Sequence, residues 1–541
     1  MSQFRQYLKK AVENVISHGD TDIFPFPVEN ILFNDKKTAV VDLLEKLHKD
    51  FDGYIANYPL LHERSLQAVG YYGFRYGTQL DPLWNTYLLA LVLSIADDIE
   101  SARVPSSRKK VFSYRYSFDK KKSSLFDRDS NWSAFNEKAT EFAQKHKVIL
   151  KCDISNFYPS IYHHRLENAL KKASTNTESI RRILKVLTKI SKGVSYGLPV
   201  GGPAARLLSE LLLNRTDRLM LSEGIDFCRY ADDYIIFSNT VEEAYAQLIF
   251  ISEKLHENEG LAIQKSKTQI MSSTEFLSLS EFGDNSDNTE EDQQEINFLK
   301  LRLFYDPYSP TADEDYDELT GELNKFDIIG MLGKEISKSR INQALTRRLI
   351  NAVKYLSETQ KKAAIYSLFS SAEDKKSNLD ILYPVFPSVM ILTRAIISEL
   401  DDETKEIVFT ELRNLITNES YITQVPVNLS YAIRILAHDK SEETDFALSK
   451  SFKGEDNPII RGDIILAMAQ RDSDFWISDK LKSYGSLSRW EKRSLLISSY
   501  ILKDEGEHWR DKVKNEIPEV DTLLLEWFSD RINNGEWGVV L

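Results

Sequence analysis

Three aspartates have the residue type and the spacing for phosphoryl-transfer chemistry. Asp153 follows the apolar run Val148–Leu150, and Asp232 and Asp233 lie side by side in RYADDYIIFS, residues 229–238. Carboxylates at a strand end and across a hairpin can hold a hard divalent cation such as Mg²⁺, and two such ions can clamp the attacking and leaving oxygens of a phosphoryl transfer. We expect Asp153 and Asp232 to form this clamp. Asp233 should support Asp232, because neighbours in a strand point to opposite faces. A solvated hairpin turn is the alternative for the pair.

Two further stretches are suited to phosphate. GLPVGGPAARLLSELLLNRTDRLM, residues 197–220, places three glycines and two prolines before an amphipathic helix. Glycine lets the backbone approach a ligand closely, and the start of a helix favours phosphate. GLAIQKSKTQI, residues 260–270, contains Lys265 and Lys267, and a lysine there could neutralise or protonate a departing pyrophosphate. The alternatives are a plain Gly-Pro loop before a core helix and ordinary surface lysines.

The elements that must position these residues change along the chain. Residues 1–100 predict helices, and Asp81-Pro82 predicts a helix start. Residues 103–122 hold eight Lys or Arg and one Asp among aromatic residues. Residues 148–300 alternate short apolar runs with helices, which indicates an α+β region. The acidic and polar segment 280–295 predicts a mobile loop or a domain junction.

Beyond about residue 310 the sequence predicts helices with a weak repeat. YAIRILA ends at Ala437, IILAMA at Ala469 and LISSYI at Ile501, which are 32 residues apart (469 − 437 and 501 − 469). A period near 32 with apolar helix faces indicates stacked helical pairs, and an irregular helical bundle is the alternative. Trp476 and Trp509 nearly share the spacing, and we expect them in the core between repeats.

Composition narrows the class of protein. A chain of 541 residues is long enough for two to four domains. Its net charge of -13 argues against a basic coat over the whole surface, so an anionic substrate must meet a local basic patch. The longest apolar stretch, Tyr87 to Ala96, is too short to cross a bilayer. The first residues lack a hydrophobic signal core, and two cysteines exclude a disulfide framework. We expect a cytoplasmic protein.

Taken in the order in which they follow one another along the chain, these four stretches resemble motifs A, B, C and D of reverse transcriptases. DISNFYPSI is similar to motif A of the retron and group II intron branch, GLPVGGPAARLLSE to its motif B and YADDYIIF to its motif C. The upstream RKKVFSYR, residues 108–115, resembles the fingers motif that grips the triphosphate. The resemblance covers roughly residues 100 to 275. One departure is Val200, which stands where some reverse transcriptases carry Gln.

The resemblance implies roles residue by residue. Tyr158, five residues after Asp153, matches the aromatic gate that selects deoxynucleotides, and Lys267 matches the motif D lysine. The resemblance implies two Mg²⁺ ions, with Mn²⁺ as a substitute. It assigns the catalytic and metal sites to Asp153, Asp232 and Asp233, adds Lys267 to the catalytic site, and assigns the nucleotide site to Lys110, Arg115, Tyr158 and Gly201.

The layout is similar to the abortive-infection (Abi) reverse transcriptases of bacterial phage defence. It implies a helical region and start of fingers at 1–100, α+β reverse-transcriptase-like fingers and palm at 101–300, and an all-α HEAT-like repeat domain at 301–541. The implied function is antiviral DNA synthesis from dNTPs, untemplated and protein-primed, by a homo-oligomer with no membrane partner and with single-stranded DNA attached to the protein. A templated enzyme of the retron or CRISPR-associated kind is the alternative, followed by a helical scaffold with a non-catalytic core.

Overall fold

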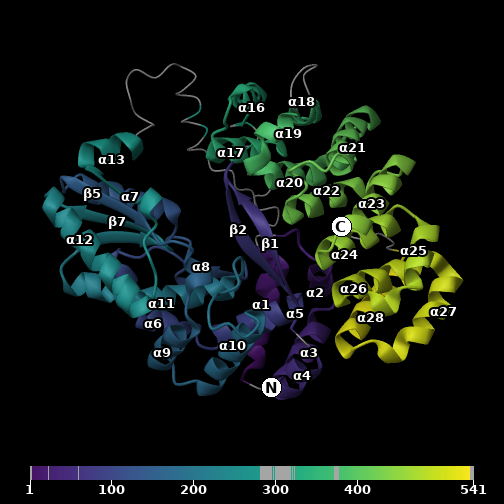
Figure 1. The fold of residues 1–541 in the computed structure, drawn as a ribbon, viewed down its shortest axis with the longest axis horizontal. Helices are drawn as coiled ribbons and strands as arrows, with labels where there is room; N and C mark the ends of the chain where they lie inside the picture. Colours follow the sequence, from purple (N-terminus) through teal and green to yellow (C-terminus); the bar gives the residue numbers. More distant parts are fainter. Residues whose placement is uncertain are drawn as a thin grey trace. The chain divides into compact units, whose positions relative to one another are not determined.

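Two compact units make up the chain (Figure 1). The structure, a computed structural model, describes residues 3–21, 24–58, 60–280, 323–370 and 377–535 and the single positions 295, 298, 319, 321 and 541. The first unit comprises Met1–His62 and Gly77–Asp284, and the second comprises Glu63–Tyr76 and Asn285–Leu541. Between residues 280 and 295, the predicted junction lies outside the described residues and stays a prediction.

The first unit mixes helices and strands, as the sequence predicts for residues 148–300. Its helices are α1 Arg5–His18, α2 Glu29–Asp35, α3 Lys37–Lys49, α4 Phe51–Asn57, α5 Pro82–Leu93, α6 Ala96–Ala102, α7 Trp132–Ala143, α8 Phe157–Ser160, α9 His163–Ala173, α10 Thr177–Ile190, α11 Pro203–Ser222, α12 Val241–Lys254 and α13 Ser273–Ser280. A small two-stranded sheet joins β3 Tyr116–Asp119 and β4 Ser124–Phe126.

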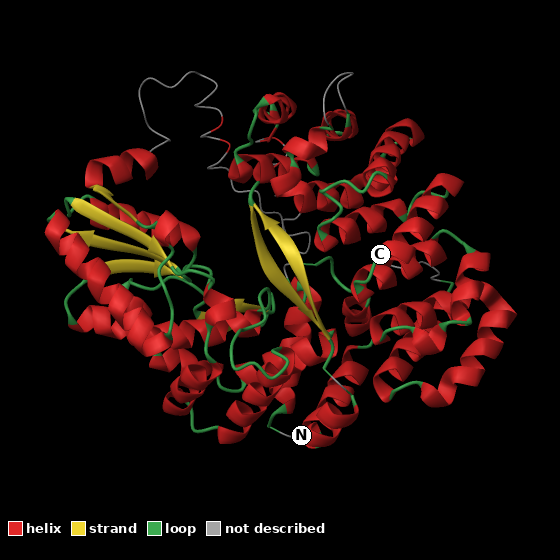
Figure 2. Cartoon of the chain, in the orientation of Figure 1, coloured by secondary structure: helices red, strands yellow, loops and turns green. Residues whose placement is uncertain are grey.

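A four-stranded antiparallel sheet carries the predicted aspartates. Its strands, in the order β6-β7-β5-β8, are β6 Asp226–Tyr230, β7 Asp233–Ser238, β5 Val148–Asp153 and β8 Gln269–Ser272 (Figure 2). The predicted strand before Asp153 and the predicted hairpin around Asp232 are both confirmed. Buried β-branched and aromatic side chains fill β7, which suits a strand covered on both faces.

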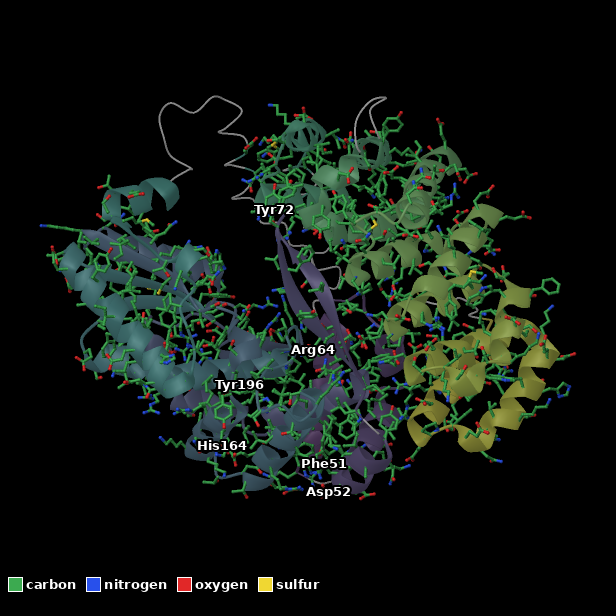
Figure 3. All side chains as sticks on the ribbon, in the orientation of Figure 1. Phe51, Asp52, Arg64, Tyr72, His164 and Tyr196 are labelled. Carbon is green, nitrogen blue, oxygen red and sulfur yellow. The ribbon has the colours of Figure 1, made fainter. Side chains whose placement is uncertain are left out.

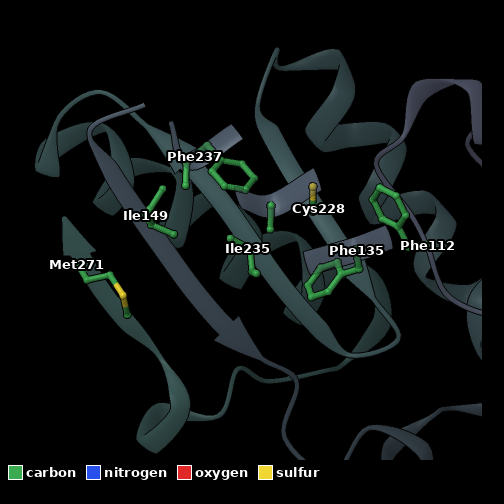
Figure 4. Close-up of a cluster of buried hydrophobic side chains, with 9 residues drawn as sticks. Phe112, Phe135, Ile149, Cys228, Ile235, Phe237 and Met271 are labelled. Atoms are coloured by element: carbon green, nitrogen blue, oxygen red, sulfur yellow. The ribbon is translucent and has the colours of Figure 1, made fainter. Parts of the chain in front are cut away.

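One face of this sheet packs against α7 and the segment around Phe112, which precedes β3 (Figure 4). The buried cluster consists of Phe112, Phe135, Ala139, Ala143, Ile149, Cys228, Ile235, Phe237 and Met271. Alternate residues of a strand point to the same face. Asp153 therefore continues the face of Ile149, and Asp233 continues the face of Ile235, at the strand ends where the hydrophobic cluster stops. Helices α11 and α12 contact the sheet as well.

The predicted helix start at Asp81-Pro82 is confirmed. The Asp81 carboxylate accepts hydrogen bonds from the backbone N–H groups of Leu83 (3.0 Å) and Trp84 (3.4 Å), and Pro82 occupies the first turn. Helix α5 is buried along its whole length, as expected of a helix that is apolar on every side. Across the described ranges, no helix combines the length and the apolar character that a membrane span requires.

The prediction that residues 1–100 are helical is wrong for residues 62–80. They form a hairpin of β1 His62–Val69 and β2 Gly73–Leu80, whose outer part belongs to the second unit. The tip is held there, because the Tyr71 hydroxyl donates to the carbonyl of Ile381 (2.8 Å). The overlooked signal was GYYG between strand-forming residues, with Gly70 at φ 72° in the turn. Figure 3 labels Arg64 and Tyr72 on this hairpin.

The rest of the described second unit is helical, which confirms a helical C-terminal region. Its helices are α16 Ile328–Ser337, α17 Gln343–Val353, α18 Glu358–Phe369, α19 Asn378–Ile381, α20 Phe386–Ile396, α21 Asp402–Thr417, α22 Pro426–Leu436, α23 Glu442–Gly454, α24 Pro458–Gln470, α25 Asp474–Leu481, α26 Arg489–Ser498, α27 Lys503–Val513 and α28 Glu519–Asn533.

Alternate helices of this unit stack on one another. Helices α20, α22, α24, α26 and α28 contact each other in succession. Helices α22, α24 and α26 begin 32 and then 31 residues apart (458 − 426 and 489 − 458). Trp476 meets Phe452 edge-on at 5.1 Å between ring centroids, and Trp509 meets Tyr484 in the same way at 5.1 Å. Both tryptophans are only half-buried, so they make equivalent contacts between neighbouring elements, and the prediction of a fully buried core position is not met. The HEAT-like classification stays a prediction.

Candidate active site

The three aspartates come together at one end of the sheet. Asp153, the last residue of β5, is paired in register with Asp233, the first residue of β7. Asp232 precedes Asp233 in the tight turn from β6, and its carbonyl accepts a hydrogen bond from the N–H of Ile154 (3.2 Å). Asp153 is buried, with 6% of its surface exposed. The sheet register therefore brings together carboxylates that lie 79 residues apart in the chain (232 − 153).

The carboxylates act on one another electrostatically. Burial and the charge of Asp153 raise the pKa of Asp232 to about 7. Burial and the charge of Asp153 also raise the pKa of Asp233. Like charges in a partly desolvated site disfavour simultaneous ionisation. Binding of a cation would therefore stabilise this site. Carboxyl groups with shifted pKa values of this kind are typical of functional sites.

Lys267 supplies a cation at this position. Its ammonium forms an ion pair with Oδ2 of Asp153, although 66% of the lysine side chain is exposed. Lys267 follows a turn that is anchored beside β5, since the N–H of Gln264 donates to the carbonyl of Asp153 (2.8 Å). The hydrogen bond to Asp153 raises the pKa of Lys267, so it stays charged at neutral pH. Tertiary structure thus brings the predicted motif D lysine to the predicted motif A aspartate.

The carboxylates could bind divalent cations, although they do not form a complete set of ligands around one metal position. Among the described residues, no group of three or more His, Cys, Asp or Glu side chains is arranged around one metal position. The Oδ1 atom of Asp153, however, is buried without a hydrogen-bond partner. A buried carboxylate oxygen without a donor is costly, and a hard cation would satisfy it. Asp153 and Asp232 would hold such an ion, with Asp233 beside them.

A buried ionic network fixes the turn that carries Asp232. Arg229 on β6 is fully buried, and its guanidinium donates to the carbonyl of Ala231 (2.8 Å), whose φ of 52° is left-handed. The same guanidinium bonds Asp217 (2.9 and 2.7 Å) and Glu210 (3.1 and 2.9 Å) on α11. Burial by itself would raise the pKa of Glu210, but the charges of Arg229 and Arg103 outweigh it and lower the pKa. Sequence analysis did not single out Arg229, Glu210 or Asp217.

Tyr158 is held in place by the helix of motif B. It lies on the short helix α8, and its hydroxyl shares a hydrogen bond with Ser209 of α11. Burial raises the pKa of Tyr158 strongly, so the phenol stays neutral. The ring therefore has the support that a selective side chain needs, and its role as a sugar gate stays a prediction.

Lys110 and Arg115 are not brought to the aspartates. The Lys110 ammonium donates to Asp226 (2.6 Å) and lies over the ring of Phe142. Arg115 is 2% exposed, and its guanidinium donates to Glu100 (2.8 Å) and to the carbonyls of Val104 (2.6 Å) and Val111 (3.2 Å). A triphosphate would reach Arg115 only after these contacts opened. Their assignment as triphosphate ligands has no support in this geometry and stays a prediction.

Arg206 is a candidate nucleotide contact that sequence analysis missed. It stands in the first turns of α11, and its guanidinium lies 5.2 Å from the ring of Tyr114. Arg206 and Gly201 line one cavity of about 210 Å³ together with residues of α1 and β4. Gly201 has φ 115°, a backbone conformation that favours glycine. The signal was present in PAARLL, where Arg206 is the first charged residue after the glycines.

Comparison with known proteins identifies the class to which this site belongs. Residues 101–302 match the family model for reverse transcriptase (RNA-dependent DNA polymerase), and this range includes every predicted site residue. The chain therefore contains a reverse transcriptase domain and is a nucleotidyltransferase of the reverse transcriptase superfamily.

Resemblance beyond this domain is weak. A solved telomerase from Candida albicans, in complex with a fragment of telomeric RNA, is similar at 11% identity, over 71% of this chain and 69% of the telomerase chain, with a TM-score of 0.31. No curated protein matches the chain. The assignment therefore rests on the family match and on the site.

Proposed function

We propose that the chain is a DNA polymerase that adds deoxynucleotides without a template, primes on a hydroxyl of a protein and acts in abortive infection against phage. The observation that supports nucleotide addition is the cluster of three carboxylates, in which the charge of Asp153 raises the pKa values of Asp232 and Asp233 and Lys267 is bound to Asp153. Divalent cations held there would clamp the attacking and leaving oxygens of the transfer.

The residues of the chain have distinct tasks in this reaction. Asp153 and Asp232 provide the negative charge that would hold the divalent cations, and these cations would offset the negative charge of the incoming triphosphate. Lys267 is 66% exposed, so its side chain has room to leave Asp153 when a triphosphate binds. Its ammonium then neutralises the charge that develops on the departing pyrophosphate. Tyr158, fixed by Ser209, lies beside the sugar and disfavours a 2′-hydroxyl.

Charge supports synthesis without a bound duplex. An enzyme that grips a long duplex needs many phosphate contacts, whereas this chain has a net charge of -13. Two cations of the predicted fingers motif, Lys110 and Arg115, are engaged with Asp226 and Glu100. A templated enzyme is the second candidate, and the description of the matched family as RNA-dependent favours it.

One gel assay separates these functions. The purified full-length protein is incubated with Mg²⁺ and labelled dNTPs, without template or primer, and run on a denaturing gel before and after protease digestion. A ladder that migrates with the protein, and that protease shifts, supports the proposal. Product that requires an added template supports the templated enzyme. No product under either condition contradicts polymerase activity.

We also propose that the helical unit forms a contact between copies of the chain. Two aromatic side chains of this unit are exposed, Phe446 on α23 by 68% and Phe475 on α25 by 95%. Burying such side chains between subunits is favourable. The double variant Phe446→Glu/Phe475→Glu should lower the subunit number measured by light scattering. Tyr366→Glu, at a residue that is 58% exposed on α18, is the control. An unchanged subunit number in the double variant would exclude this contact.

A further inference from the structure

A second cavity of the reverse transcriptase unit lies away from the aspartates. Its volume is about 760 Å³, within the usual range for small-molecule sites. It is lined by α9, by the second half of α11 and by the π-helical turn Leu255–Glu259 that follows α12. None of the residues that line it has a role in the proposed nucleotide addition. The cavity is therefore a candidate site of its own.

The charge of this cavity is opposite to that of the chain. Five cationic side chains and one carboxyl line it, namely Arg165, Lys171, Lys172, Arg215, Arg218 and Glu259. Two of the cations are already oriented by the backbone, because Arg165 donates to the carbonyl of Glu257 (3.2 Å) and Arg218 to that of Ala102 (2.6 Å). Guanidinium groups in fixed positions bind phosphate well, since their planar fork matches its oxygens.

The inner part of the cavity differs from its basic rim. Leu211 and Leu212 of α11 are buried apolar residues of the lining. Glu259 is only 4% exposed, and burial raises its pKa to about 7 despite the nearby Arg215 and Arg165. Near neutral pH this carboxyl can donate or accept a hydrogen bond. The cavity thus offers an apolar wall, a hydrogen-bonding group and a cluster of cations.

We propose that this cavity binds a nucleoside polyphosphate, with the phosphates on the cations and the base against the leucines near Glu259. Apolar walls with few polar groups orient a ring, and the cations hold the charged end. Inorganic polyphosphate shares the phosphate chemistry and is distinguished by the test below. This site is separate from the polymerase site and does not depend on the proposed function.

The cavity is linked to the active site by a short segment. Seven residues separate Glu259 from Lys267, and between them the carbonyl of Ala262 accepts a hydrogen bond from the N–H of Ser155 (2.8 Å). The segment then bonds to Asp153 through Gln264 (2.8 Å). A nucleotide that contacts Glu259 would therefore lie next to the segment that anchors Lys267 beside Asp153.

Binding of ATP to the full-length protein tests the proposal. Isothermal titration is done in EDTA, which removes the cations that the polymerase site needs. The double variant Lys172→Glu/Arg215→Glu should weaken ATP binding at least tenfold, with an unchanged melting temperature. The control Lys120→Glu/Lys189→Glu makes the same change of charge at two exposed lysines outside the cavity. Equal binding by the wild type and the cavity variant, or an equal loss in both variants, would overturn the site.

Two further measurements keep the outcome decisive. Ala169→Phe fills the cavity from α9 without changing charge, so it should also weaken ATP binding even if the charge variant folds poorly. Tripolyphosphate is then titrated as a competitor. Displacement of ATP only at concentrations at least tenfold higher supports recognition of the nucleoside. Displacement at equal concentration would overturn the placement of the base and reduce the cavity to a polyphosphate site.

Discussion

The two units bury charge in opposite ways. In the helical unit, arginines on successive stacked helices meet acids on the next helix, as in Arg434 with Asp463 (2.9 Å) and Arg493 with Asp521 (2.8 Å). In the reverse transcriptase unit, Asp153, Asp232 and Asp233 place like charges together. Paired buried charges set the register of a fold, whereas unbalanced ones are costly unless a ligand compensates them. The imbalance marks the site where we propose that nucleotide addition takes place.

The same contrast exists within the reverse transcriptase unit. Arg229, Glu210 and Asp217 form a compensated network directly behind the turn that carries Asp232. This network holds the backbone at Ala231 through a charge-assisted hydrogen bond. A balanced support therefore positions an unbalanced cluster, and the two should respond differently to loss of charge.

Removing one charge from the unbalanced cluster should have the largest effect on activity. Asp232→Asn should lower nucleotide addition by several orders of magnitude, because a cation ligand is lost. The folded pKa of Asp232 lies above its unfolded value, so ionising Asp232 destabilises the folded state. This destabilisation is absent at low pH and is complete above about pH 7. The variant should therefore melt at an equal or higher temperature than the wild type at pH 8. Retention of more than about a tenth of wild-type incorporation would contradict the assignment.

Removing one charge from the balanced network should lower stability instead. Glu210→Gln leaves Arg229 and Arg103 without their shared partner, and the unfolding free energy should fall by about 3–5 kcal/mol. Denaturant titration measures it. Glu223→Gln, at the exposed end of the same helix, is the control and should change little. A loss below about 1 kcal/mol would show that the network is not compensated as described.

The helical unit should lose stability without losing chemistry. Asp463→Asn breaks the buried pair with Arg434 and should destabilise this unit by about 3 kcal/mol. Nucleotide addition per folded molecule should stay at the wild-type level at low temperature. Asp474→Asn, at an exposed position of α25, is the matched control. If fully folded Asp463→Asn protein lost nucleotide incorporation, the arginine–acid pairs of the helical unit would be linked to catalysis. The contrast between the two units would then be weakened.

The raised pKa of Asp232 predicts a pH dependence. Below about pH 7 the carboxyl of Asp232 gains a proton, and the proton competes with the cation that the site must bind. The rate of nucleotide addition should fall as the pH decreases from 8 to 6. Higher Mg²⁺ should move the midpoint to lower pH, since the ion then competes better. A rate that does not change between pH 6 and 8 at limiting Mg²⁺ would exclude Asp232 as a ligand.

The smallest expected effect concerns sugar selection. Tyr158→Ala should raise the ratio of ATP to dATP incorporation, because the missing ring leaves room for a 2′-hydroxyl. Ser209→Ala, which frees the Tyr158 hydroxyl, should raise the ratio less. Tyr162→Ala is the control, since Tyr162 stacks on Tyr196 at 4.8 Å. An unchanged ratio in Tyr158→Ala would make Tyr158 a packing residue.

Local sequence patterns predicted much of the secondary structure of this molecule. The apolar run before Asp153, the hairpin around Asp232 and the start of α5 at Pro82 follow from strand composition and helix capping, which act over a few residues. The helical character beyond residue 323 follows from apolar periodicity. The hairpin at 62–80 was missed although GYYG is a local turn signal; only its anchorage on Ile381 depends on a residue far away in the sequence.

The sequence by itself determined which residues could do chemistry, namely the aspartates, Lys267 and the glycines before α11. Only the tertiary structure decided which of them meet. It placed Lys267 on Asp153, buried Arg115 against Glu100 and brought Arg206 beside Tyr114. The reason is physical. Residue type and local spacing set what a side chain can do, but pKa, burial and ion pairing depend on neighbours that the sheet register and helix packing bring from distant parts of the chain.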